Sequence, residues 1–72
     1  MKPIKYKALA KLLRSLDCEH VRTKGDHEIW RAPDGSTTTI PVGKSVAPGT
    51  AREIRNHLTE SLGDGWLGDL EK

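Results

Sequence analysis

The tripeptide Pro33-Asp34-Gly35 separates two runs rich in β-forming residues, and it constrains the fold of this 72-residue chain more than any other feature. Proline presets the backbone for a turn, aspartate hydrogen-bonds to its own backbone, and glycine adopts the left-handed conformation that closes a short loop. The flanking runs, residues 27–32 and 36–42, are therefore predicted to pair as the two strands of a β-hairpin.

The same turn sets the register of the hairpin. With Gly35 in the left-handed position of a three-residue loop, the cross-strand pairs are Ala32 with Ser36, Trp30 with Thr38, Glu28 with Ile40, and His27 with Pro41. Directly paired residues share a face of the sheet, so one face is predicted to meet the core and to carry Trp30, Ala32, Thr38, Ile40 and Val42. The opposite, wetter face carries His27, Ile29, Arg31, Thr37 and Thr39. Glu28 falls among the apolar set, and we expect its position near the strand end to let it reach water.

Periodicity predicts the elements that precede the hairpin. An amphipathic helix is predicted over residues 6–17 from a leucine stripe at helical spacing, formed by Leu9, Leu12, Leu13 and Leu16. Residues 18–24 alternate in the manner of a half-buried strand.

A second helix is predicted after the hairpin. Thr50 and Glu53 match a capping box, in which the hydroxyl and the carboxylate each bond a free backbone amide at the helix start. Gly63 is the predicted stop, and the inward stripe comprises Ala51, Ile54 and Leu58.

Together these elements predict one α+β domain over residues 1–72, with a three-stranded antiparallel sheet and two helices on one of its faces. A chain of this length builds one modest core. The lone Cys18 has no disulfide partner within the chain and is expected to be a small buried residue. Residues 64–72 form an acidic C-terminal tail, expected to cover apolar surface in a short turn through Trp66, Leu67 and Leu70.

Charge is segregated along the chain, although the net charge is only +2. Residues 1–24 carry seven basic and two acidic side chains, residues 25–57 balance, and residues 58–72 carry four acidic side chains and one basic one. A basic segment of this kind favours a polyanionic partner, most simply nucleic acid. The alternative, that these lysines only solvate the outer face of a helix, is left open by charge alone.

Hydropathy bears on the compartment. The chain has no run of eighteen apolar residues, and its first residues lack the apolar core of a signal peptide. A cytoplasmic protein without membrane contact is therefore expected.

His27 follows the turn Gly25-Asp26 at the start of a predicted strand and is the candidate for acid–base chemistry. Imidazole changes charge near physiological pH, which suits it to moving protons. A lone histidine in a small domain is more often an ordinary surface residue, and the position of His27 in the sequence does not distinguish this from a catalytic role. His20 and His57 lack a turn or motif that focuses them, and the three histidines lack the short spacings of a metal site.

Taken together, the motifs resemble the HicA family of mRNA interferase toxins. The resemblance spans nearly the whole chain and rests on the order and spacing of four segments: Lys24-Gly25-Asp26-His27-Glu28-Ile29-Trp30-Arg31, Pro33-Asp34-Gly35, Thr39-Ile40-Pro41-Val42, and Pro48-Gly49-Thr50 with Ile54. It implies an α-β-β-β-α fold like that of a double-stranded-RNA-binding domain. It also implies the toxin component of a type II toxin–antitoxin system, an endoribonuclease that cuts single-stranded mRNA without a cofactor and is held by a HicB-type antitoxin.

The resemblance places His27 at the family's essential histidine, with two departures. Asp26 stands where serine or threonine is usual, and Gly43 where a histidine often follows the proline-valine pair. His27 is expected to act as general acid or base without a metal, supported in its turn by Gly25 and Asp26.

Cations near His27 are the candidates for binding RNA phosphate. Lys24, Arg22 and Arg31 are the nearest in sequence. Lys44, Arg52 and the free amides at the Thr50 helix start are expected to hold another phosphate. Ordinary strand-edge solvation is the alternative for each of these cations taken singly. Threonine hydroxyls on the wetter face are candidates for contact with ribose.

Two other functions remain open from the sequence. One is a noncatalytic RNA-binding module with the same fold and basic surface, and the other is a toxin-like remnant that acts only as a partner subunit. The enzyme hypothesis and the binding-module hypothesis both predict salt-sensitive RNA binding. Only the enzyme hypothesis predicts that RNA is cut. An acidic or strand-presenting antitoxin is expected to silence the enzyme by covering His27.

Overall fold

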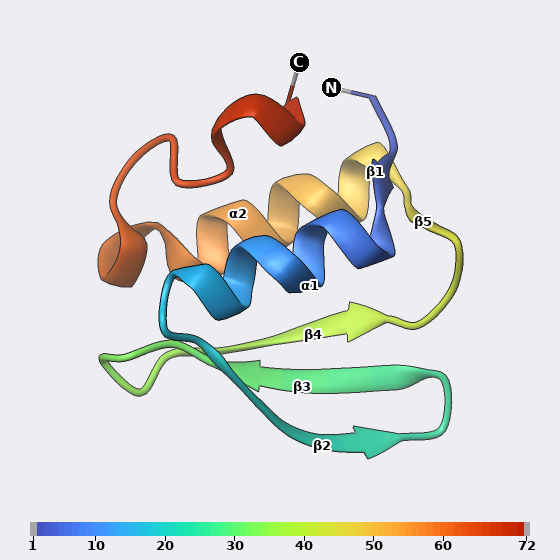
Figure 1. Ribbon diagram of the computed structural model, residues 1–72, viewed down its shortest axis with the longest axis horizontal. Coiled ribbons are helices and arrows are strands. Elements are labelled where there is room, and N and C mark those ends of the chain that lie inside the picture. Colours follow the sequence, from blue (N-terminus) through green and yellow to red (C-terminus); the bar gives the residue numbers. More distant parts are fainter. Residues whose placement is uncertain (1, 72) are drawn as a thin grey trace.

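Two helices cover one face of a three-stranded antiparallel sheet and leave its other face uncovered (Figure 1). The computed structural model describes residues 2–71, except for the side chains of Asp69 and Glu71. Within this range no helix is long and apolar enough to span a membrane. The α+β architecture predicted from the sequence is confirmed, with α1 (Tyr6–Ser15), β2 (Glu19–Lys24), β3 (His27–Arg31), β4 (Thr37–Pro41) and α2 (Pro48–Leu62).

A second, two-stranded sheet joins the beginning of the chain to the segment before α2. Strand β1 (Ile4–Lys5) pairs antiparallel with β5 (Ser45–Val46), and the Tyr6 N–H donates to the Lys44 carbonyl at 3.1 Å. The sequence does not predict these strands because two residues are too few to show an alternation. Their pairing holds the start of α1 beside the chain that follows β4.

The hairpin between β3 and β4 forms in the predicted register. Its loop is closed by the Ala32 N–H, which donates to the Ser36 carbonyl at 2.7 Å, and by the Gly35 N–H, which donates to the Ala32 carbonyl at 2.9 Å. Gly35 has a φ of +94°, where a side chain would be strained. The Asp34 carboxylate accepts the Ser36 N–H at 2.8 Å, and this backbone bond is the main cause that lowers the pKa of Asp34.

The core lies between the sheet and the two helices. Its largest fully buried member is Trp30, which is only 1 % exposed, as the predicted register requires. Cys18 is buried too, and burial is the main cause that raises the pKa of its thiol. Both predicted helical stripes take part, and the fully buried side chains include Leu9, Leu13, Ile40, Ile54, Leu58 and Leu67.

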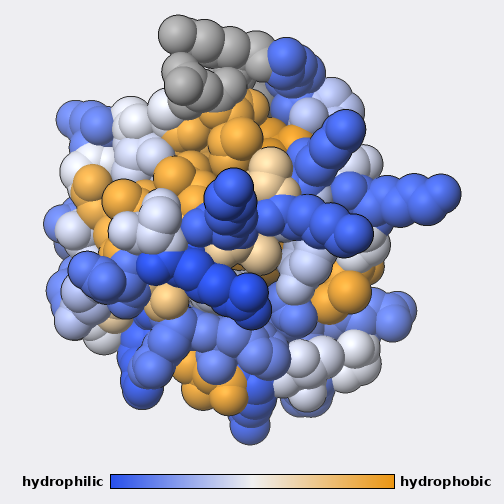
Figure 2. Space-filling view, in the orientation of Figure 1, coloured by the Kyte–Doolittle hydropathy of each residue, from blue (hydrophilic) through white to orange (hydrophobic). Residues whose placement is uncertain are grey.

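The chain after α2 folds back over the helices. Helix α2 ends at Gly63 as predicted, and the 3-10 helix η1 (Gly68–Glu71) follows. Trp66 is buried, and its Nε1 donates to the Arg55 carbonyl at 3.0 Å. Figure 2 shows apolar surface on this side of the molecule, and a hollow of about 380 Å³ lies between α1 and the returning chain. Lys72, the last residue of the predicted acidic tail, lies outside the described residues.

Two predictions of burial are wrong. Strand β2 is predicted to be half-buried, yet every residue in it is exposed, including Val21 at 44 %. It is an edge strand that neither helix covers, and a bulge between His20 and Arg22 takes Val21 out of the pairing. Val42, predicted to be in the core, is 45 % exposed because it lies beyond the end of β4.

The start of α2 differs from the predicted capping box. The helix begins at Pro48 with Ala47 as its cap, and no side chain caps it. Proline suits the first position because it has no N–H to leave unpaired there. The Ala51 N–H already donates to the Ala47 carbonyl at 2.8 Å, so Thr50 lies inside the first turn and not at the boundary.

Replacing single valines tests the contribution of the small sheet. Val46 in β5 is fully buried and Val42 is half exposed, so the same substitution removes the same atoms from two environments. We expect Val46→Ala to lower the free energy of unfolding by about 2 kcal/mol and Val42→Ala by less than about 0.5 kcal/mol. Urea unfolding followed by tryptophan fluorescence measures both, and equal losses would contradict the packing described.

Candidate functional site

His27 is the first residue of β3, and the alternation of the strand places it on the face of the sheet that the helices leave uncovered. Its side chain is exposed. It pairs with Lys24 of β2 on one side and with Pro41 of β4 on the other. Because successive strand residues point to opposite faces, burial of Trp30 on the helix side places His27 on the uncovered side.

The turn before His27 is fixed through its backbone. Gly25 has a φ of +60°, so a side chain at this position would be strained. The Val42 N–H donates to the Asp26 carbonyl at 2.7 Å and ties the turn to the chain that leaves β4. Among the described residues, the Asp26 carboxylate has no hydrogen-bond or ion-pair partner. Asp26 therefore takes part in fixing the turn before His27 through its main chain.

Two of the predicted phosphate-binding cations lie close to His27. Lys24 is directly opposite it, and the Cβ atoms of such pairs are about 5 Å apart. Arg22 pairs with Ile29, the next residue of β3 on the uncovered face. Both cations are exposed, and neither is ion-paired with any carboxylate in residues 2–71 that the structure places. A phosphate at this end of the sheet would meet an imidazole and two cations.

Arg31 is not part of this group. It lies at the far end of β3, roughly 13 Å along the strand from His27, and its guanidinium is ion-paired with Glu19. Thr37, which pairs with Arg31, and Thr39 are exposed on the uncovered face.

The other two predicted phosphate-binding cations lie apart from each other. Lys44 is in the connection from β4 to β5, at the same end of the sheet as His27. Arg52 is exposed on α2, in the layer on the other side of the sheet. The amides expected to help them near Thr50 lie inside the first helical turn. Lys44 and Arg52 therefore do not form one site with His27.

Glu28 lies directly behind His27, on the helix side of β3, and the prediction that it reaches water is wrong. Its side chain is only 15 % exposed, and Oε1 accepts hydrogen bonds from the Tyr6 hydroxyl and from Trp30 Nε1, the latter at 3.1 Å. His20 Nε2 lies 3.8 Å from the other carboxylate oxygen. No sequence pattern points to this cluster because Tyr6 lies 22 residues earlier, on a helix.

The two acidic groups of this cluster have displaced pKa values. Burial alone would raise the pKa of Glu28, but the hydrogen bonds from Tyr6 and Trp30 and the charges of His20 and Arg14 outweigh it and lower the pKa. Burial first, and the bond to Glu28 second, raise the pKa of Tyr6 to about 12. Over the neutral range the phenol keeps its proton and the carboxylate is ionised, so the hydrogen bond between them is maintained.

The remaining histidines lie on the helix side of the sheet. His20 pairs with Trp30, and its ring is tilted against the indole with 5.7 Å between centroids. His57 Nδ1 lies 3.0 Å from Oγ1 of Thr38, the buried hydroxyl of β4. Both are therefore on the opposite side of the sheet from His27, where His20 contacts an aromatic ring and His57 a hydroxyl.

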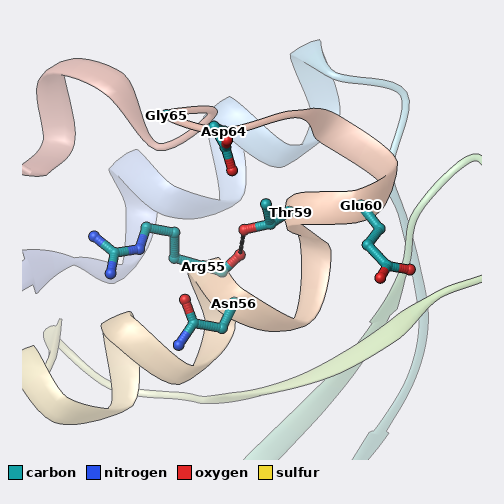
Figure 3. Close-up of a pocket in the computed structure, with 6 residues that line it drawn as sticks. All are labelled: Arg55, Asn56, Thr59, Glu60, Asp64 and Gly65. Atoms are coloured by element: carbon teal, nitrogen blue, oxygen red, sulfur yellow. Dashed lines mark hydrogen bonds between the residues drawn. The ribbon is translucent and has the colours of Figure 1, made fainter.

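Among the described side chains, neither a metal site nor a converging set of groups along α2 is found. Within residues 2–71, no group of three or more histidine, cysteine, aspartate and glutamate side chains is placed to hold a metal ion. A hollow of about 500 Å³ runs along the second half of α2 (Figure 3). There Arg55 and Glu60 point away from each other, and the Thr59 hydroxyl donates to the Arg55 carbonyl at 2.7 Å. These side chains diverge and do not converge on a substrate.

Comparison with known proteins yields one match. A family model described as "HicA toxin of bacterial toxin-antitoxin" matches residues 6–60, which is most of the chain. The matched segment runs from the start of α1 into α2 and includes the whole main sheet with His27. No curated protein and no solved structure matches the chain. The likeness to a double-stranded-RNA-binding domain therefore rests on the order of the elements.

Replacing Glu28 with glutamine tests the cluster behind His27 through its pH dependence. The folded pKa lies below the ordinary value of 4.5, so the ionised carboxylate stabilises the fold above about pH 4.5, and this contribution is lost as the pH falls through the folded pKa. We expect Glu28→Gln to be about 1–3 kcal/mol less stable than wild type at pH 7, and the difference to shrink toward pH 3.

Urea unfolding at both pH values measures this difference. Glu60→Gln, at an exposed position on α2, is the matched control and should change stability by less than about 0.5 kcal/mol. A Glu28→Gln difference that stays constant as the pH falls would show that the carboxylate charge contributes nothing.

Proposed function

Because the chain belongs to the HicA toxin family of bacterial toxin–antitoxin systems, we propose that it is an mRNA interferase that cuts single-stranded mRNA with His27 as general acid or base. The chain acts as a single domain over residues 1–72. The observation that carries the proposal is the exposed His27, paired with Lys24 on the uncovered face of the sheet.

RNA brings its own nucleophile to such a site, the 2′-hydroxyl. The 2′-oxygen forms a new bond to the adjacent phosphorus, and the bond from phosphorus to the 5′-oxygen of the next nucleotide breaks. The 2′-proton passes to a base, and the leaving 5′-oxygen takes a proton from an acid. Neutral imidazole at His27 serves the first transfer or imidazolium serves the second, with water as the other proton partner; acid–base help of this kind is worth roughly 10² to 10⁴-fold.

Charge builds up on the phosphate during this reaction. Lys24 lies opposite His27, and Arg22 lies two residues earlier in β2 on the same uncovered face; both are exposed cations whose backbone positions are set by strand pairing. Cations held in place where negative charge develops stabilise the transition state without reorganising. Side chains of the protein, the RNA's own 2′-hydroxyl and water thus account for every step, and the proposed reaction needs no metal ion or cofactor.

A toxin of this family has a cognate antitoxin as its partner, and we propose that this one is of the HicB type and covers His27. The uncovered face presents the imidazole with its cations, and beside it β2 is an exposed edge strand. An acidic surface, or a strand that adds to this edge, is complementary to these features. With mRNA as substrate, the proposed place of action is the cytoplasm.

Replacing His27 with alanine tests the proposed chemistry. We expect RNA cleavage by purified protein to fall by at least about 100-fold and growth arrest on expression to disappear, since the general acid or base is lost. Antitoxin binding and the circular dichroism spectrum should be unchanged because the side chain is exposed. His20→Gln, on the helix side of the sheet, is the control and should still cut.

If the His27→Ala variant cut RNA as fast as the wild-type protein does, the catalytic role of His27 would be contradicted. Wild-type protein that binds RNA but leaves it intact would identify a noncatalytic RNA-binding module. Wild-type protein that neither binds RNA nor arrests growth would identify a subunit that acts only through its partner.

A further inference from the structure

A hollow rimmed by lysines lies where the beginning of the chain meets the segment after β4. Its volume is about 500 Å³, within the usual range for ligand pockets. Pairing of β1 with β5, and the hydrogen bond from the Tyr6 N–H to the Lys44 carbonyl at 3.1 Å, join its two walls. The fold itself therefore builds the hollow from distant parts of the chain, with the lining residues Lys5, Tyr6, Lys7, Gly43, Lys44 and Ser45.

The charge of this hollow is strongly one-sided. Lys5, Lys7 and Lys44 are all exposed, and in the part of the chain that the structure describes no carboxylate lies within ion-pair distance of any of them. The first turn of α1 also contains no acidic residue. Three like charges gathered without an ion-paired carboxylate raise the local concentration of anions and favour a polyanionic ligand.

Tyr6, which lies between Lys5 and Lys7 in the chain, is the aromatic residue of the lining. It is partly buried and packs against the core, and its hydroxyl is held by the Glu28 carboxylate. Gly43 adds no side chain to the opposite wall. A fixed aromatic ring beside ammonium groups is the combination that binds single-stranded nucleic acid, with a base stacked on the ring and phosphates on the cations.

The hollow lies close to His27. Gly43 follows Val42, whose N–H donates to the carbonyl of Asp26, the residue before His27. Chain geometry then limits the separation of the Gly43 and His27 backbones to roughly 13 Å. A strand positioned over His27 reaches the hollow within a few nucleotides, around the end of the sheet.

We infer that this hollow is a nucleotide subsite for the RNA substrate, with an unpaired base stacked on Tyr6 and the adjoining phosphates bound by Lys5, Lys7 and Lys44. The inference rests on the proposed RNA substrate and extends it to a second contact region away from the reacting phosphate. It also gives the predicted phosphate contact of Lys44 its structural partners.

Two substitutions of Tyr6 separate stacking from the hydroxyl contact. Tyr6→Phe and Tyr6→Leu both lose the hydrogen bond to Glu28, and only Tyr6→Leu loses the ring. The probe is a fluorescent single-stranded oligoribonucleotide with every ribose 2′-O-methylated, so that attack by the 2′-hydroxyl is blocked during fluorescence anisotropy. We expect Tyr6→Phe to bind within about twofold of wild type and Tyr6→Leu to bind roughly 5- to 100-fold more weakly. Equal affinities for the two variants, with both folded by circular dichroism, would overturn the stacking role.

Salt dependence tests the lysines with the same probe. Each of Lys7→Gln and Lys44→Gln should reduce the slope of log affinity against log salt concentration by about 0.7, the value for one phosphate contact with a single strand. Lys11→Gln, one turn further along α1 and outside the hollow, is the control and should leave the slope unchanged. Slopes equal to wild type in Lys7→Gln and Lys44→Gln would overturn the phosphate role.

Cleavage of unmodified RNA is measured separately, so the subsite and the nuclease fail independently. If the protein shows these changes in binding but does not cut RNA, the subsite is supported and the proposed nuclease activity is contradicted. If the protein cuts RNA but the Tyr6 and lysine variants bind RNA as tightly as wild type does, the nuclease activity is supported and the subsite is contradicted.

Discussion

The carboxylate of Glu28 is the contact on which the arrangement of helix and sheet depends. It accepts hydrogen bonds from Tyr6 at the start of α1 and from Trp30, the largest buried side chain of β3. The Arg14 guanidinium, 5.5 Å from the centre of the Trp30 ring, makes a further link between α1 and β3. Removing the carboxylate would leave the buried Trp30 N–H and the partly buried Tyr6 hydroxyl without an acceptor, which costs more than the net value of the bonds themselves.

Successive side chains of β3 point to opposite faces of the sheet, so the contacts on the helix side also determine which residues face the other way. Glu28 and Trp30 point toward the helices, so His27 and Ile29 point away from them. A slip of one residue would expose the indole and bury the imidazole, and the packing of Trp30 opposes it. The exposed histidine thus owes its position to buried contacts behind it. The lysine-rimmed hollow shares this anchor, because the hydroxyl of Tyr6, one of its lining residues, is held by the same carboxylate.

Features set by near neighbours could be predicted from the sequence, and features set by distant contacts could not. Pro33-Asp34-Gly35 determines the hairpin register locally, and the leucine stripe likewise identifies α1. The Tyr6–Glu28 contact and the β1–β5 pairing join segments whose proximity no local pattern encodes. Alternation in β2 does not reveal an edge strand without a helix over it. Arg31 is near His27 in sequence, but an extended strand carries it to the far end of the sheet. Thr50 resembles a cap, yet Pro48 begins the helix two residues earlier.

The most direct test of the proposed reaction is the chemical identity of the ends that cleavage leaves on RNA. Attack by the 2′-hydroxyl, with His27 moving a proton, predicts a 2′,3′-cyclic phosphate on one fragment and a 5′-hydroxyl on the other. Mass spectrometry of a cleaved oligoribonucleotide distinguishes these ends, and a substrate with 2′-deoxyribose at the scissile position should stay intact. Fragments with 3′-hydroxyl and 5′-phosphate ends, or cleavage of the deoxyribose substrate, would contradict the mechanism.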